Sequence, residues 1–151
     1  DDKRAEEYIQ KAKINLQLCE LYKKQRMDYK IPEEWFYSQY YCALAILAKF
    51  GVESRSQKCT ALFLGYVKDK GLIDYKEFID RITVYKEKEE ETDVDEREKA
   101  RYGSSVQSEE IMGKYTSMMD VCNRCISVCE EIVFSEKKFE VPKEFLSLVR
   151  K

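Results

Sequence analysis

The stretch that decides the fold is "FYSQYYCALAILAKFGVESRSQKC", residues 36–59. It runs through aromatic, small and aliphatic residues with hardly a charge, then breaks at Gly51 and becomes polar. On a helix of about 3.6 residues per turn, these side chains leave almost no polar face. The sequence therefore predicts a helix that other helices, or a second subunit, cover on most sides.

Two helices are predicted before Gly51. Residues 3–26 carry apolar side chains at three- and four-residue steps between charges, which is typical of an amphipathic helix. The apolar helix follows from Pro32 to about Phe50. Pro32 suits its first turn, because the amide hydrogen that proline lacks has no partner there in any case.

A third helix is predicted over residues 54–71 and a fourth over residues 74–103. Each range opens with a capping-box pair and ends at a glycine. Residues 86–98 are so highly charged that they predict a solvated part of the fourth helix.

The last long helix is predicted to begin at Ser108, whose side chain suits an N-cap. Its apolar residues fall at alternating four- and three-residue steps, which predicts a packing seam made by Ile111, Tyr115, Met118, Cys122, Cys125, Cys129 and Ile132. Residues 135–151 are predicted to be an amphipathic extension. The fold class is all-α, one domain over residues 1–151. It is expected to be an up-and-down helical bundle of four main helices with short additional helices and a core over about residues 3–134.

Cysteine usage bears on compartment and chemistry. The six cysteines lie inside apolar segments, which predicts reduced thiols and a cytoplasmic protein. Three of them, in "CNRCISVC" at residues 122–129, suggest a metal site, since thiolates bind zinc well. Side chains on one straight helix point side by side, however, so we expect core packing, with metal binding and redox sensing as the alternatives. No metal and no cofactor is predicted.

Charge and composition exclude several classes of function. A formal net charge of -2 argues against indiscriminate nucleic-acid binding, although a local basic patch can still bind RNA. The longest apolar run falls far below the roughly 20 residues of a membrane span, and the charged start has no signal-peptide core, so no membrane partner is expected. The chain has no histidine, which removes imidazole acid–base chemistry and the commonest catalytic zinc sites.

Three stretches together resemble the HEPN family of helical domains, specifically its small stand-alone prokaryotic members: "YYCALAILAKFGVESRSQKC", "YVKDKGLIDYKEF" and "REKARYGSSVQSEEI". The resemblance covers residues 3–134 and implies an up-and-down bundle that often dimerises. Many members of that family are metal-independent ribonucleases built on an arginine followed four to six residues later by a histidine. Others pair with minimal nucleotidyltransferases in toxin–antitoxin modules.

The resemblance assigns roles to two candidate catalytic residues in the fourth helix. Arg97 occupies the arginine of the family motif and Tyr102 its closing aromatic position. Arg97, Arg101 and Arg55 are the candidate phosphate- or RNA-binding residues. The alternative for the arginines is ordinary ion pairing along the helix surface, Arg97 with Asp93.

Two further residues, Cys59 and Tyr41, are candidates for the cleft that the resemblance implies. Cys59 stands where the small subgroup often has histidine, and its alternative is core packing. Arg101 is also a departure, because the subgroup usually has an acid at that position. An arginine can hold the scissile phosphate, but RNA cleavage also needs a base and an acid. Ordinary HEPN ribonuclease activity is therefore expected to be weakened or lost.

The leading prediction is a HEPN-type nucleotide- or RNA-associated protein. It would be a homodimer that binds phosphate through Arg97 and Arg101 and acts with a nucleotidyltransferase partner in a toxin–antitoxin-like module. Two alternatives stay open. One is an active metal-independent ribonuclease in which Arg97 holds phosphate and Tyr102 handles protons, and the other is a non-catalytic dimerisation and interaction module.

Overall fold

The computed structural model describes residues 2–52, 60, 62–65 and 105–135, which are largely helical and contain no β-strand. The all-α prediction is therefore confirmed for this part of the chain. The helices are α1 (Asp2–Lys24), the 3-10 helix η1 (Asp28–Lys30), α2 (Ile31–Lys49), α6 (Ser105–Gly113) and α7 (Tyr115–Val133).

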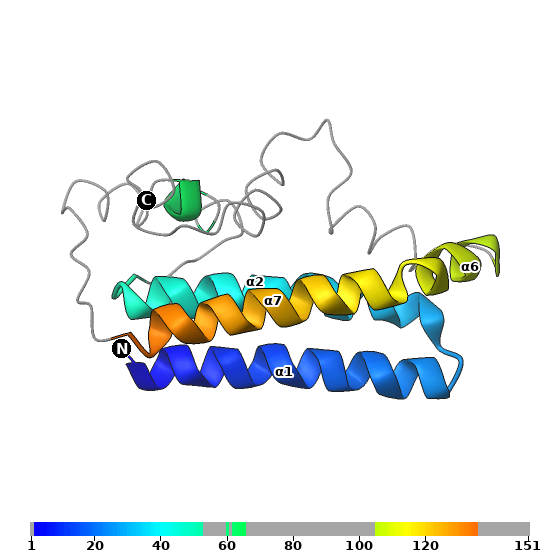
Figure 1. The fold of residues 1–151 in the computed structure, drawn as a ribbon, viewed down its shortest axis with the longest axis horizontal. Coiled ribbons are helices and arrows are strands. Elements are labelled where there is room, and N and C mark those ends of the chain that lie inside the picture. Colours follow the sequence, from blue (N-terminus) through cyan, green and yellow to red (C-terminus); the bar gives the residue numbers. More distant parts are fainter. Residues whose placement is uncertain (1, 53–59, 61, 66–104, 136–151) are drawn as a thin grey trace.

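Three long helices lie along one another (Figure 1). Helix α1 runs antiparallel to α2, while α7 runs in the same direction as α2 and packs against both. Of the predicted third helix, Thr60 and residues 62–65 are described, and they are helical. The predicted fourth helix over 74–103, its charged run and the extension from 136 onward lie outside the described residues.

Helix α1 forms where the sequence predicts it, within two residues at each end. Its buried side chains recur at three- and four-residue steps and face α2 and α7: Ala5, Ile9, Ala12, Leu16 and Cys19. Two tyrosines of the predicted apolar stripe, Tyr8 and Tyr22, lie at the edge of this core and are only partly buried. The small residues let α2 approach closely, and the buried Ser38 of α2 donates a hydrogen bond of 3.1 Å to the Ala12 carbonyl oxygen.

Helix α2 is the central element of the described part. Twelve of its 19 residues are buried, which confirms that this apolar helix is covered on most sides. Pro32 lies in its first turn, as predicted. After the helix ends, Gly51 adopts a left-handed φ of 78°, a conformation in which glycine carries no Cβ penalty. The turn leaves Phe50 packed edge-to-face on Phe63, with ring centroids 5.3 Å apart.

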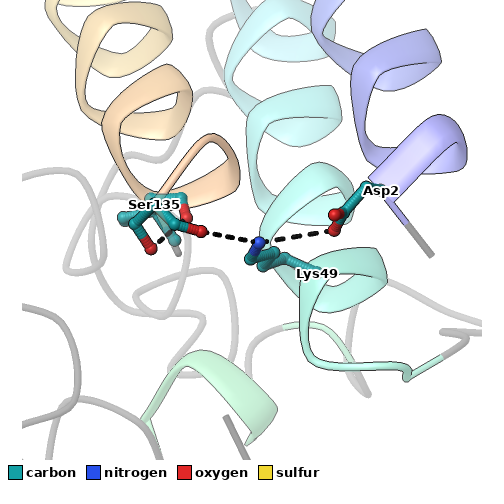
Figure 2. Close-up of polar contacts among 4 residues, drawn as sticks. Asp2, Lys49 and Ser135 are labelled. Atoms are coloured by element: carbon teal, nitrogen blue, oxygen red, sulfur yellow. Dashed lines mark hydrogen bonds and ion pairs between the residues drawn. The ribbon is translucent and has the colours of Figure 1, made fainter. Parts of the chain in front are cut away.

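One lysine joins the ends of three helices. Lys49 Nζ lies 3.3 Å from Asp2 Oδ1 and donates a hydrogen bond of 3.0 Å to the Ser135 carbonyl oxygen (Figure 2). Its side chain is only 10% exposed. The charge is thus shielded from water and held by the first turn of α1 and the residues that follow α7.

The predicted last helix differs from the observed one. Ser108 does not cap it, because helix α6 already begins at Ser105 and the Ser108 hydroxyl donates instead to Asp28 Oδ2 of η1. The chain then leaves helical geometry for one residue, Lys114, before α7 begins. Helix α6 packs on η1 while α7 packs along α1 and α2, so the two segments need different directions.

The predicted seam is confirmed at six of its seven positions, and Ile132 is half-buried beside the fully buried Val133. In the described part of the chain, no helix combines the length and the apolar character that a membrane crossing requires.

Candidate nucleic-acid interface

Of the residues predicted to form the site, Tyr41 is the one that the structure describes. The candidate phosphate-binding and catalytic residues Arg55, Arg97, Arg101 and Tyr102, and the cleft candidate Cys59, lie outside the described residues. The site can therefore be built outward from Tyr41 alone.

Tyr41 lies half-buried on α2, beside Tyr8 of α1. Their ring centroids are 6.1 Å apart and their planes differ by 22°. At this separation near-parallel rings are offset, so part of each ring face is not covered by the other ring. Tyr37, one turn before Tyr41, continues the aromatic surface at a centroid distance of 6.2 Å.

A lysine sits over the junction of these two rings. Lys11 Nζ is 5.6 Å from the centroid of Tyr8 and 5.6 Å from that of Tyr41. The guanidinium carbon of Arg4 lies 5.9 Å from the Tyr8 centroid. Arg4, Tyr8 and Lys11 are spaced by four and three residues, which places them on one side of α1. Exposed cation–π contacts of this kind contribute about 0.5–1 kcal/mol each.

The same arrangement recurs farther along α1 and α2. Tyr22 lies on the same side of α1 as Tyr8, and Lys30 Nζ is 5.6 Å from the Tyr22 centroid. Fourteen residues separate the two tyrosines, which is about 21 Å along a helix. We call the residues Tyr8, Lys11, Tyr22, Lys30 and Tyr41 the tyrosine–lysine track.

The track lies on the side of α1 away from α7. Lys13 follows Lys11 by two residues and so points across the helix, where its Nζ lies 3.5 Å from Glu130 Oε2 of α7. The flank of the described core that α7 does not cover is therefore the one that carries the track.

A partly buried acid lies between the two ends of the track. Glu34 Oε2 accepts a hydrogen bond of 2.6 Å from Asn15 Nδ2. Burial raises the pKa of Glu34, with a smaller contribution from Glu33, and the bond from Asn15 opposes the rise. The Oδ1 atom of Asn15 is buried without a hydrogen-bond partner in the described part. A protonated Glu34 could donate to it, which the carboxylate cannot.

The described cysteines are core residues, as predicted. All five are free and buried, and Cys59 lies outside the described residues. A hydrogen bond with Cys129, together with burial, raises the pKa of Cys42 well above its ordinary value, and burial raises the pKa of Cys19 to about 12. Protonated thiols in this setting are poor nucleophiles. Within the described ranges, no group of three or more His, Cys, Asp or Glu residues is placed to hold a metal ion.

Sequence reasoning missed Lys11, Lys30 and the surface role of Tyr8 and Tyr22, which it assigned to a core stripe. The usable signal is the alternation of tyrosine with lysine or arginine on the same side of α1, at Arg4, Tyr8 and Lys11. Comparisons with protein-family models, with curated proteins and with solved structures found no match for this chain.

Proposed function

We propose that this protein is a HEPN-type nucleotide- or RNA-associated protein that binds phosphate through Arg97 and Arg101. In this proposal the described helices belong to a four-helix up-and-down bundle that forms a homodimer and acts with a nucleotidyltransferase partner. The motif resemblance around Arg97 supports the proposal from the sequence. The structural observation that carries it is Lys11 Nζ placed over both Tyr8 and Tyr41, at the one predicted site residue that is described.

Binding is favoured over catalysis because of the side chains available. Transfer of the 2′-hydroxyl proton at neutral pH needs a base, and the chain has no histidine to supply one. Tyr102 or Cys59 would need a lowered pKa to replace it. The arginine pair needs no such adjustment to bind phosphate, because guanidinium groups are always charged.

The test compares the native chain with an Arg97→Ala, Arg101→Ala double variant on a mixed pool of tRNA and unstructured RNA in EDTA. The double variant should bind RNA more weakly, and its salt dependence should fall by about 1.4 in log–log slope, or about 0.7 per lost phosphate contact on single strands. A Lys24→Ala, Arg26→Ala variant removes the same charge from the exposed end of α1 and serves as the matched control.

Equal binding by the double variant and the native chain would refute the arginine site. Cleavage by the native chain that the double variant loses would replace the binding proposal with the ribonuclease alternative, and Tyr102 would be the next residue to change. Light scattering tests the dimer, whose mass should be twice the 18.0 kDa of one chain.

A further inference from the structure

We propose that the tyrosine–lysine track is a second RNA-binding subsite, which takes a single strand along α1 with bases on the tyrosine rings and phosphates on the lysines. This inference rests on the proposed association with RNA and adds to it the strand state of the ligand and a surface distinct from the arginine pair.

The first step in the argument is the geometry at Tyr8 and Tyr41. The two rings come from different helices, both anchored in the core, so the platform is held in place before any ligand arrives. Near-parallel, offset rings present a broad aromatic surface of the kind on which a base stacks. Both side chains are half-buried, so they keep a firm anchor and an accessible part.

The second step is the position of Lys11. With Nζ equally distant from both ring centroids, the ammonium covers the junction where a base would lie. A lysine stem is flexible, so the ammonium can move from the rings to a phosphate while a base takes its place. The exchange gives up a cation–π contact of about 0.5–1 kcal/mol for base stacking of about 1–3 kcal/mol and a charge-assisted hydrogen bond.

The third step is the repeat of the same pair at Tyr22 and Lys30. Two stations about 21 Å apart on one side of a straight helix suit a ligand longer than one nucleotide. Proteins that bind single strands combine aromatic side chains for successive bases with cations for the backbone. Duplex RNA keeps its bases paired and stacked inside the helix, where half-buried tyrosines cannot reach them.

Charge on this side of the molecule also permits binding. Arg4 adds a third cation beside Tyr8. The acid that faces the middle of the track, Glu34, has a raised pKa because of burial and so opposes an approaching phosphate less than an exposed carboxylate would.

The experiment measures fluorescence anisotropy of a labelled uridine oligomer of about 12 nucleotides, a length typical of single-strand sites, with the full chain. Tyr41→Leu should weaken binding at least about fivefold, the lower end of the cost of one lost stacked base, while Tyr41→Phe should bind like the native chain. Lys11→Gln should lower the salt slope by about 0.7. Tyr29→Leu and Lys24→Gln are the matched controls, because both side chains are exposed and lie outside the track.

Circular dichroism of each variant checks the fold, and Tyr41→Phe with Lys11→Gln keeps the test valid if Tyr41→Leu unfolds. A duplex of the same length should bind at least about fivefold more weakly than the single strand, since it forgoes stacking on at least one ring. Binding within twofold of native for both Tyr41→Leu and Lys11→Gln would overturn the inference. Equal affinity for uridine monophosphate would overturn the assignment to a strand and leave a mononucleotide site, and equal affinity for a DNA strand would overturn the assignment to RNA.

The two proposals fail separately. If the Arg97→Ala, Arg101→Ala variant loses RNA binding while the tyrosine variants keep it, the proposed function stands and the track is not a subsite. If the tyrosine variants lose binding and the arginine variant keeps it, the track stands and the arginine site is refuted.

Discussion

At the scale of single residues, the pair Asn15 and Glu34 shows how a buried polar contact can be incomplete. Asn15 donates to Glu34, but its own acceptor atom is buried without a partner in the described structure. A carboxylate offers only acceptors, so it cannot satisfy that oxygen. The contact therefore favours a neutral side chain at position 34, in line with the raised pKa that burial gives Glu34.

We expect Glu34→Gln to stabilise the protein by about 1 kcal/mol at about pH 7, because a glutamine amide can donate to Asn15 Oδ1 and accept from its Nδ2. Since the folded-state pKa of Glu34 is raised, its contribution to stability is full below the ordinary carboxyl pKa of about 4.3 and is lost as pH rises through the folded value. The gain from the substitution should therefore be largest near neutral pH and shrink as the solution is acidified.

Urea denaturation at several pH values measures this gain. Glu33→Gln is the matched control, since it removes a neighbouring charge from the same first turn of α2 without touching Asn15. A gain for Glu34→Gln that is independent of pH would show that titration of Glu34 is not its source.

At the scale of elements, the sequence predicted both ends of α1 and α2 to within two residues. Proline in the first turn and glycine after the last turn are local signals, so no tertiary contact is needed to place these ends. The break between α6 and α7 was not predicted. One residue, Lys114, leaves helical geometry, and the apolar steps from Ile111 to Tyr115 to Met118 continue across it. A pattern of spacings cannot register a turn that preserves the spacing.

Two glycines at helix ends should respond oppositely to alanine. Gly51 has a left-handed φ of 78°, whereas Gly113 lies inside α6, and neither position has an atom within 4 Å of an added Cβ. Gly113→Ala should therefore raise stability by about 0.5–1 kcal/mol through lower chain entropy in the unfolded state. Gly51→Ala should lower stability by roughly 1 kcal/mol, the cost of the left-handed region for a residue with a Cβ.

Thermal and urea unfolding of the two variants measure both changes, and each glycine serves as the other's control because added bulk is harmless at both sites. A loss of stability in Gly113→Ala would contradict the helical assignment of that residue.

At the scale of the whole molecule, the sequence predicted a helical protein with a cysteine-lined core, and the described part confirms both. It did not predict the tyrosine–lysine track. That surface depends on the register of α1 against α2, which brings Tyr8 beside Tyr41. Register comes from interlocking side chains such as Ser38 on Ala12, and the pattern of either helix alone does not contain it. Arg97, Arg101, Arg55, Tyr102 and Cys59 remain predictions from the sequence.

The buried thiols predict a simple reactivity pattern. Five of the six cysteines are in the described core, and burial or hydrogen bonding raises the pKa of Cys19 and Cys42, so little thiolate forms near neutral pH. Titration with a disulfide reagent should therefore find five thiols that react only after unfolding in guanidinium. Two or more thiols that react rapidly in the native protein would contradict the described core.

The lysine at the end of α2 has a consequence for motion. Helix ends normally open and close independently of one another, because few contacts hold the last turn. Here the first turn of α1, the last turn of α2 and the residue after Phe134 share one ammonium group, Lys49 Nζ. Fraying at any of the three removes a partner from a charge that is largely shielded from water, so local opening at this end of the molecule is a coupled event.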